Sequence, residues 1–347
     1  MKCWTRSVRQ DSLVRVLLVA LLAADGAPAQ DTPAQDTPAQ DTQAQDTIHT
    51  QSNVVIVPAL VKNAKGEAVY GLGARDFVVE DDGVEQAVRL DEATEGSMMS
   101  LVIAIQRGRR ANYEFPRIRG LSAMVDPIVE TGLGRVAVVE FDSQAELIQD
   151  FSGNPDKTAE TLNALQPGDG GAAILDAVDY SVKLLEKAPR ERQRVLLLIS
   201  ETRDHGSHEA KVEDVVAEIG QSNTAVYALA FSPSRSNVLD TMRGNNMAEM
   251  HPSPDLLAPL ILAAQAMRKN IPGTVAAMTG GEYELFATKT NFEARMIDFT
   301  NHLHSRYLLS IEPKNPHAGL HQIRVRLRDP GDRTVLARSR YWVAAQP

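Results

Sequence analysis

The feature that most constrains the fold of this chain is an alternation of apolar runs with helical patterns between residues 98 and 231. Three of the runs are dominated by aliphatic residues and cover residues 101–105, 135–141 and 194–199. Continuous apolar runs are typical of strands that are covered on both faces. Because helical patterns separate them, the sequence predicts right-handed βαβ crossovers and a doubly wound, mostly parallel sheet of the α/β class.

The other elements of this part follow from the same spacing. Helices are predicted over residues 117–130, 173–187 and 212–221, a fourth buried strand over 224–230, and a short edge strand over 146–149. Ligands of doubly wound sheets bind beyond the carboxyl ends of the strands. The loops after Ile105, Phe141 and Ile199, together with the glycine-rich segment 167–171, are therefore the expected functional loops.

A β-rich segment stands on each side of this α/β part. The first, residues 53–95, has turn residues such as Asp81-Asp-Gly83 between short apolar runs and is too small to be stable alone. The second ends the chain, after a predicted helix over 292–304, with strands over 307–312, 323–328 and 335–343. In the middle strand apolar residues alternate with arginines, which predicts one buried and one solvated face. We expect the two segments to share one sheet and to form a small β domain.

The first 29 residues have the pattern of a secretory signal peptide. A basic region precedes the apolar run 16–24, and Ala27-Pro-Ala29 supplies the small residues of a cleavage site. Nine apolar residues are too few to span a membrane, which needs about 20. The sequence thus predicts a secreted or periplasmic protein without a membrane span after cleavage. Cleavage would also remove Cys3, the only cysteine, which excludes disulfides and thiolate sites.

Residues 30–52 are predicted to be a disordered linker. They contain a tandem Gln-Asp-Thr-Pro-Ala repeat that cannot bury enough surface to offset its ordering entropy. A spacer between the folded body and the envelope and a neutral repeat expansion are both open readings. The expected organisation is a signal peptide, a linker, a β segment, an α/β domain, and a C-terminal helix with strands, over residues 1–29, 30–52, 53–95, 96–290 and 291–347.

Composition and missing motifs exclude several functions. The chain is 43% hydrophobic and 23% charged with a formal net charge of −9, which is typical of a soluble globular protein. No block of basic residues with interleaved aromatics is present, so nucleic acid is not an expected partner. The glycine-rich segment lacks the Lys-Ser/Thr of a phosphate-binding loop, and the Gly-x-Ser-x-Gly signature of many hydrolases is absent. We therefore expect a protein that is not an enzyme.

An ordered set of short motifs resembles the von Willebrand factor A-related family of secreted bacterial proteins. The motifs are a hairpin ending in Glu80-Asp-Asp-Gly83, the buried strand at Leu101, Gly170-Gly-Ala-Ala-Ile-Leu-Asp-Ala177, Leu196-Leu-Leu-Ile-Ser-Glu201, Tyr227-Ala-Leu-Ala-Phe231, Thr279-Gly-Gly281 and Arg340-Tyr-Trp342. The resemblance spans residues 53–343. It implies an A-type domain, a doubly wound sheet that serves adhesion or protein assembly, with β segments before and after it.

The same resemblance implies the place of a metal-ion-dependent adhesion site. In the family, an Asp-x-Ser-x-Ser motif, a Thr and an Asp hold Mg²⁺ through hard oxygen ligands. The matching positions here are Gln106, Gly108, Arg110, Ala172 and Glu201. Four of the five have lost the usual ligand, and a cation at Arg110 would repel Mg²⁺. The sequence therefore predicts a degenerate site that binds no metal and needs no cofactor.

Arginines near the degenerate site suggest how it would work without metal. We expect Arg110 to pair with Glu201, because a guanidinium can grip a carboxylate bidentately. The candidate partner-binding residues are Arg107, Arg109, Arg110, Arg203 and Asp204. The predicted function is a secreted, non-enzymatic interaction or adhesion module that binds a protein in the cell envelope, with an acidic surface as the favoured partner.

Two alternatives remain open from the sequence. A variant site of Asp142, Glu201 and Asp204 would support adhesion that depends on Mg²⁺ or another divalent cation. Less favoured is a hydrolase that uses His205 and His208, which follow a buried strand; in the competing interpretation, an Asp or Ser of this loop caps a helix.

Overall fold

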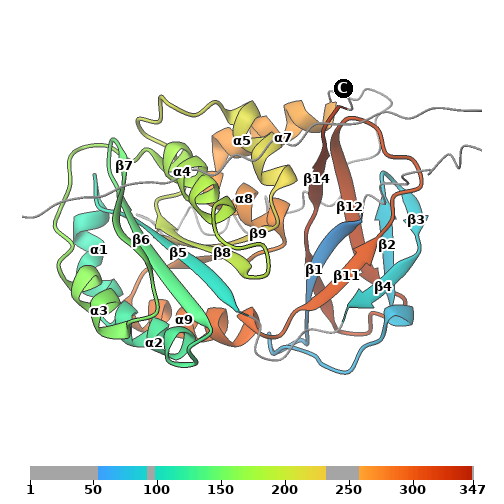
Figure 1. Cartoon of the computed structure of the whole chain (residues 1–347), viewed down its shortest axis with the longest axis horizontal. Helices are drawn as coiled ribbons and strands as arrows, with labels where there is room; N and C mark the ends of the chain where they lie inside the picture. The colour runs from blue at the N-terminus through green and yellow to red at the C-terminus, as the bar shows by residue number, and fades with distance from the viewer. Residues whose placement is uncertain (1–53, 92–97, 232–257, 346–347) are drawn as a thin grey trace, which may run out of the picture. The chain divides into compact units, whose positions relative to one another are not determined.

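The structure is a computed structural model that describes residues 54–91, 98–231 and 258–345 (Figure 1). The predicted signal peptide and linker lie outside the described residues, so their predictions stay untested. The described residues form one six-stranded sheet and two four-stranded sheets. None of the helices in these ranges is both long and apolar enough to cross a membrane.

The six-stranded sheet confirms the predicted doubly wound fold. Its strands, in the spatial order β10-β9-β8-β5-β6-β7, are β5 (Met99–Gln106), β6 (Gly134–Phe141), β7 (Ala145–Ser152), β8 (Gln193–Ser200), β9 (Thr224–Phe231) and β10 (Tyr283–Phe286). All neighbours pair in parallel except β7, which runs antiparallel to β6 along the edge. The strand order reverses between β5 and β8, and this switch point is where doubly wound sheets bind ligands.

Helices cover both faces of this sheet (Figure 1). One face carries α4 (Ile174–Glu186), α5 (Val212–Gln221), α7 (Ala258–Lys269) and α8 (Ile271–Thr279), and the other carries α1 (Ala111–Ile118), α2 (Leu121–Glu130), α3 (Pro155–Asn163) and α9 (Lys289–Leu303). Alternate residues of β5 explain its unbroken apolar sequence. Val102 and Ala104 enter the first core, whereas Leu101, Ile103 and Ile105 enter the second.

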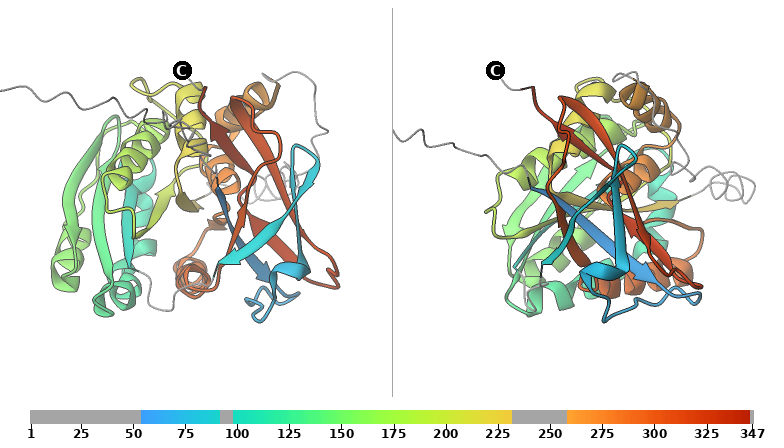
Figure 2. Two further views of the ribbon diagram at one scale, coloured as in Figure 1. Left: turned by 45° about the vertical axis from the view of Figure 1, so that its right-hand side comes forward. Right: turned by 90° about the vertical axis from the view of Figure 1, so that its right-hand side faces the viewer.

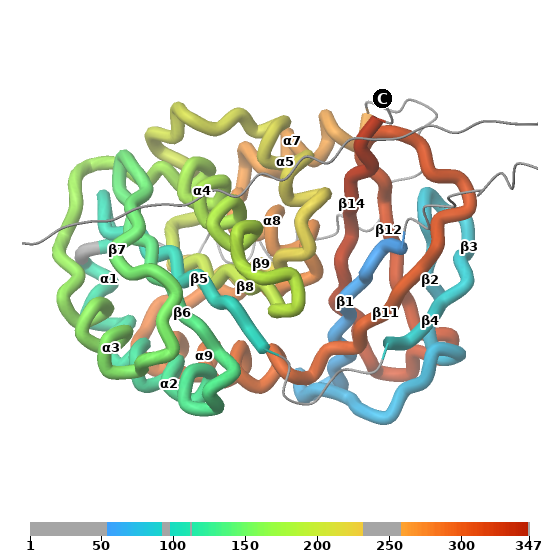
Figure 3. The backbone as a smooth tube through the Cα atoms, in the orientation of Figure 1, coloured from blue at the N-terminus to red at the C-terminus, as the bar shows by residue number. Residues whose placement is uncertain are grey.

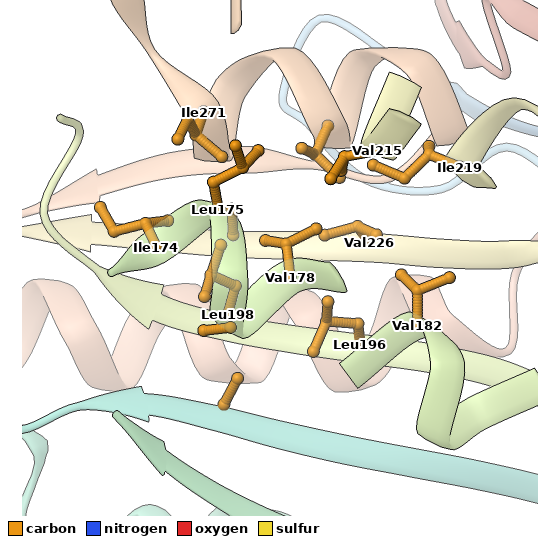
Figure 4. Close-up of a cluster of buried hydrophobic side chains, with 14 of the residues drawn as sticks. Ile174, Leu175, Val178, Val182, Leu196, Leu198, Val215, Ile219, Val226 and Ile271 are labelled. Atoms are coloured by element: carbon orange, nitrogen blue, oxygen red, sulfur yellow. The ribbon is translucent and has the colours of Figure 1, made fainter. Parts of the chain in front are cut away.

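The first of these cores is the one drawn in Figure 4. Leu196 and Leu198 of β8 point toward the same cluster as Leu175 and Val178 of α4 and Val215 of α5. These side chains are at most 4% exposed. Burial of that extent stabilises a structure by about 1.5–3 kcal/mol for each large aliphatic side chain. The core thereby fixes α4 and the loops at its N-terminal end against the strands.

The two terminal segments form a β-sandwich. Its sheets have the orders β13-β1-β11-β4 and β14-β12-β2-β3. The strands are β1 (Val55–Lys62), β2 (Phe77–Asp81), β3 (Val84–Gln86), β4 (Val88–Asp91), β11 (Tyr307–Ile311), β12 (Gly319–Leu327), β13 (Thr334–Ala337) and β14 (Arg340–Val343). Blue and red strands therefore lie side by side in Figures 1 and 2. The segments share two sheets, where the sequence predicted one.

The tube in Figure 3 lets the reader follow the chain from the first strands of this sandwich to the last. Strands β1–β4 come first, the α/β sheet and its helices follow, and the chain returns through α9 to β11. Strand β12 has the predicted alternation. Ile323 and Leu327 are 3% exposed, while Arg324 and Arg326 face solvent.

Three local features differ from the prediction. The helix expected over 117–130 is divided into α1 and α2, because Gly120 adopts a left-handed φ of 89° between them. Helix α3 was not predicted; its mean hydropathy is low, but Asn154 caps it by accepting from the N–H groups of Asp156 and Lys157. Helix α9, predicted over 292–304, packs on α1, α2 and β9, contacts that the sequence did not predict.

Candidate functional site

The loops singled out in the sequence meet at the switch point of the six-stranded sheet. Gln106 ends β5, Asp142 follows β6 and Glu201 follows β8. Backbone hydrogen bonds tie the glycine-rich segment to them, because Arg109 N–H donates to Asp169 O (2.9 Å) and Gly168 N–H donates to Arg107 O (3.0 Å). We call these converging loops the crevice: residues 106–110, 140–144, 167–172 and 201–204.

Gln106 forms the floor of the crevice and is held by Glu201. The Gln106 side chain is 1% exposed, and its amide oxygen accepts the Glu201 N–H at 2.8 Å. Its amide nitrogen donates to Glu201 Oε1 at 3.1 Å and to Gly108 O at 3.2 Å. A carboxylate here would face Glu201 with like charge. The amide instead supplies a donor, so Glu201 is stabilised without a cation between the two side chains.

Arg109, and not Arg110, is the cation that pairs with Glu201. The Arg109 Nε lies 3.4 Å from Glu201 Oε1, and the Arg109 side chain is 33% exposed. The prediction of an Arg110–Glu201 pair is therefore wrong. Arg109 has a left-handed φ of 52°, which turns the chain sharply before α1. Arg110 is the N-cap residue of α1 and its side chain is exposed.

Arg107 neutralises a second pair of acids on the β6 side. Its Nε lies 3.0 Å from Asp142 Oδ2, and its Nη1 lies 3.3 Å from Glu140 Oε1. Burial raises the pKa of Glu140, while the positive charge of Arg107 works in the opposite direction. Asp142 is 7% exposed and also accepts the Asp169 N–H at 3.3 Å. Its oxygens are thus engaged by protein donors.

The glycines of the crevice allow its backbones to pack in direct contact. A Cβ atom added to Gly108 would lie 2.0 Å from the Gly171 carbonyl oxygen and 2.8 Å from Asp142 Cβ. One added to Gly168 would lie 2.5 Å from Asp142 Oδ2. A side chain at residue 108 therefore has no room in this arrangement. Ala172 is fully buried and is bridged to His205 by two backbone hydrogen bonds of 2.7 and 2.8 Å.

Asp169 fixes the tip of the glycine-rich segment. Its Oδ1 accepts the N–H groups of Gly171 (2.7 Å) and Ser143 (3.1 Å). The hydrogen bond from the Ser143 side chain, followed by those from the backbone, lowers the pKa of Asp169. The residue stays charged and holds the loop against β6, a role that the sequence analysis did not assign.

The loop after β8 uses its polar groups to cap α4. Asp204 Oδ1 accepts the Leu175 N–H at 3.1 Å and the Ser207 hydroxyl at 2.6 Å, and Ser207 Oγ accepts the Asp176 N–H at 3.1 Å. These are bonds to N–H groups that a helix start leaves without internal partners. Within the described ranges, Asp142, Glu201 and Asp204 do not converge as a group of carboxylate oxygens that could hold an ion.

Asp176, which the sequence analysis missed, organises the rest of this loop. Its side chain is buried and accepts the N–H groups of His208 (2.9 Å), Glu209 (3.3 Å) and Ala210 (2.8 Å). The His208 ring is 62% exposed, and its Nδ1 contacts the Gly206 carbonyl at 3.0 Å. His205 is also exposed. Within the described ranges, neither histidine ring hydrogen-bonds a serine hydroxyl, and the contacts of this loop are those of a capped strand-to-helix turn.

The crevice residues do not fit the magnesium ion that the resemblance implies. Mg²⁺ needs hard oxygen ligands in a nearly octahedral arrangement. Of the five positions, Gly108 and Ala172 have no side-chain oxygen, and Arg110 is a cation. Gln106 directs its amide nitrogen toward Glu201, and Glu201 is paired with Arg109. We therefore derive no function through a magnesium ion at this place.

Comparisons with solved structures give low similarity. BatB from Bacteroides thetaiotaomicron is 13% identical, with a TM-score of 0.40 over 59% of this chain and 98% of that chain. An aerotolerance-related membrane protein from Bacteroides fragilis is 14% identical, with a TM-score of 0.38 over 58% and 98%. Proximal thread matrix protein 1 from the mussel byssus is 14% identical, with a TM-score of 0.41 over 64% and 49%.

No curated protein matches the sequence. The family model of the von Willebrand factor type A domain matches residues 111–204, which run from α1 through β6, β7 and α4 to the loop after β8. The matched range contains most of the crevice and both strands on one side of the switch point. Residues 111–204 are thus similar to a von Willebrand factor type A domain, and in the structure they form part of a doubly wound sheet.

Proposed function

We propose that this chain is a secreted, non-enzymatic interaction module whose von Willebrand A-type domain binds an acidic surface of an envelope protein without a divalent cation. The observation that carries the proposal is the state of Glu201. Its side chain accepts from Gln106 and pairs with Arg109, so protein donors occupy the direction from which the family's metal would be bound. The predicted signal peptide supports an extracytoplasmic location.

The arginines of the crevice supply the charge that a metal ion supplies elsewhere. Arg107 and Arg109 offset Asp142 and Glu201, and Arg110 and Arg203 add exposed positive charge at the rim. Arg109 is one-third exposed, and partly exposed ion pairs contribute only about 0–1 kcal/mol. Arg109 can therefore leave Glu201 and pair with a partner's carboxylate with little loss of free energy. A guanidinium also offers the planar fork that grips such a group with two hydrogen bonds.

The proposal of a non-enzymatic role rests on the loop after β8. Asp204 accepts hydrogen bonds from the first turn of α4 and from the Ser207 hydroxyl, and the His208 ring contacts a backbone carbonyl. A general base needs hydrogen-bond reach to a nucleophile or substrate proton. His208 instead contacts the Gly206 carbonyl and, through its backbone N–H, Asp176 of α4. We therefore assign it a structural role.

Capture from envelope fractions tests the proposal with a charge-matched control. We expect the immobilised chain to retain the same protein in the presence and absence of EDTA. The double variant Arg110→Glu/Arg203→Glu should lose that protein, because it reverses the charge of the rim without touching a described ion pair. The double variant Arg119→Glu/Arg324→Glu changes two exposed arginines elsewhere and should retain it. Loss of capture in EDTA, or equal capture by the two double variants, would refute the proposed mode.

A further inference from the structure

A cluster of two histidines and two aspartates lies in the β-sandwich, in a different domain from the crevice. Asp81 and Asp82 end β2 and begin the β2–β3 turn, while His317 and His321 come from the β11–β12 loop and from β12. These elements are neighbours because β2 and β12 pair antiparallel. Figure 1 shows β2, β3 and β12 side by side at this end of the sheet.

Three ligand atoms of the cluster converge. Asp82 Oδ2 lies 2.8 Å from His321 Nδ1 and 3.3 Å from His317 Nε2, and all three atoms are within 4.8 Å of one another. Zinc binds nitrogen and oxygen ligands at about 2.0–2.2 Å, so tetrahedral neighbours are separated by about 3.3 Å. The two distances from Asp82 Oδ2 to the histidine nitrogens, 2.8 and 3.3 Å, are close to this separation. Small adjustments of the side chains would place one ion between them.

Two buried atoms at the centre of the cluster lack a directed hydrogen bond. His321 is fully buried and Asp81 is 4% exposed. His321 Nδ1 and Asp81 Oδ1 are 3.4 Å apart, and neither has a partner with hydrogen-bond geometry. Buried polar atoms are normally satisfied, and an exception needs an explanation such as an ion. His321 Nδ1 is also one of the three converging ligand atoms.

The second nitrogen of each ring is already oriented by the backbone. His321 Nε2 lies 2.7 Å from the His317 carbonyl, and His317 Nδ1 lies 3.2 Å from the Ala318 carbonyl. A carbonyl can only accept, so each of these nitrogens carries a proton. The other nitrogen of each ring, His321 Nδ1 or His317 Nε2, lies next to Asp82 and is the atom that would bind a metal ion. Metal-binding histidines almost always have this outer hydrogen bond.

We propose that Asp82, His317 and His321 form a zinc site that joins the β2–β3 turn to the β11–β12 loop. Three protein ligands of the type N, N and O suit Zn²⁺, with water in the fourth position. Mg²⁺ is a poor candidate because it prefers oxygen ligands only. Asp81 stands beside the ligands as a further carboxylate, which strengthens the attraction for a cation.

One side chain must move for the site to close. The His317 and His321 rings are stacked, with centroids 3.9 Å apart and an interplanar angle of 22°, so their lone pairs are not yet aimed at one point. His321 is locked between His317 and Tyr341. His317 lies in a loop with 38% of its side chain exposed and can rotate. Exposure of His317 and Asp82 also gives the ion an entry path from solvent.

Titration of the metal-stripped full chain with Zn²⁺ against a chromophoric chelator tests the site. We expect one zinc per chain with micromolar or tighter affinity, no competition by Mg²⁺, and an intense tetrahedral absorption spectrum when Co²⁺ replaces zinc. Zinc should also raise the melting temperature. An affinity no tighter than millimolar, or a weak octahedral Co²⁺ spectrum, would overturn the proposal.

Variants assign the zinc to this cluster. His317→Ala removes a partly exposed ligand, and Asp82→Asn keeps the left-handed backbone (φ 47°) that Asn tolerates. Each should weaken zinc binding at least about 10-fold, in line with the effect of losing even an outer-sphere partner. The control His205→Ala/His208→Ala should bind zinc like the wild type. If that control loses zinc while His317→Ala keeps it, the ion belongs to another site and the proposal is wrong.

Discussion

At the scale of single residues, the side chains of the crevice satisfy one another. Gln106 gives Glu201 a hydrogen-bond donor, and Arg109 adds a positive charge. Gly108 has no room for a side chain, since the Gly171 carbonyl lies against it. Arg107 pairs with Asp142 in the same way, so both acids have protein partners.

The family resemblance named Gln106, Gly108, Ala172 and Glu201, but it did not reveal their partners. The structure places Gln106 against Glu201, and Gly108 against Gly171, the neighbour of Ala172. The choice between Arg109 and Arg110 depended on the left-handed backbone of Arg109, which residue types do not reveal. Asp176 was missed for a similar reason. It follows the glycine-rich segment in the first turn of α4, but its three N–H partners come from a loop 32–34 residues away.

A pH prediction also belongs to the residue scale. Burial, together with a hydrogen bond and repulsion from Asp179, raises the pKa of Glu218 from 4.5 to about 7, although Lys183 opposes this. The folded state thus binds the proton more tightly than the unfolded state. The resulting stabilisation is present below pH 4.5 and is lost as pH rises to about 7.

Glu218→Gln should therefore raise the free energy of unfolding at pH 8 by on the order of 1 kcal/mol and leave it nearly unchanged at pH 5. Urea denaturation at both pH values measures this difference. Glu160→Gln, on an exposed position of α3, is the matched control and should show no pH-dependent change. A larger stabilisation at pH 5 than at pH 8 would have the wrong sign for a raised pKa.

At the scale of elements, the reliability of the prediction followed the strength of the local pattern. Helix α5 has the predicted bounds because apolar periodicity and flanking breaks agree there. Helix α3 has few apolar residues, and its start depends on one capping side chain, Asn154. The break between α1 and α2 depends on the left-handed conformation of Gly120. Single-residue conformations of this kind give no periodic signal.

Gly220 near the end of α5 provides a test of packing between the two domains. An added Cβ would lie 2.8 Å from Trp342 Cβ and 3.1 Å from Trp342 N on β14. In an open helix, replacing Gly by Ala stabilises by about 1 kcal/mol. Here we expect Gly220→Ala to destabilise by about 1–3 kcal/mol, since the clash involves backbone-proximal atoms. Thermal or urea unfolding measures the change.

Gly170→Ala is the control for that substitution. A Cβ at residue 170 meets no atom within 4 Å, so its effect on stability should be small. Equal effects of the two variants, or a gain in stability for Gly220→Ala, would mean that α5 and β14 are not packed as described.

At the scale of the whole molecule, the α/β domain is inserted in the sequence between the two halves of the β-sandwich. The β-sandwich is built from both ends of the folded region, and each of its sheets mixes early and late strands. Apolar patterning revealed the strands at both ends. The distribution of those strands over two sheets was not predictable, because pairing partners are separated by about 250 residues and no local signal connects them.

Deletion of residues 48–95 tests this organisation. Strand β11 lies between β1 and β4 and would lose both neighbours, whereas β12 would keep β14. We expect hydrogen exchange to show lost protection over residues 307–343, with the largest loss in β11. Deletion of residues 30–47, which belong to the predicted linker, is the control and should leave protection unchanged. Equal protection of β11 in both deletions would contradict the shared sheets.

The central proposal is that the crevice binds its partner without a divalent cation. Calorimetric titration of the chelator-treated chain with Mg²⁺ and Mn²⁺ tests it most directly. The His317→Ala variant serves as the sample, so that binding in the β-sandwich does not contribute. We predict no binding heat, and none after Arg110→Ser alone, because Gln106, Gly108 and Ala172 still supply no ligand. Micromolar affinity for Mg²⁺ would contradict the account.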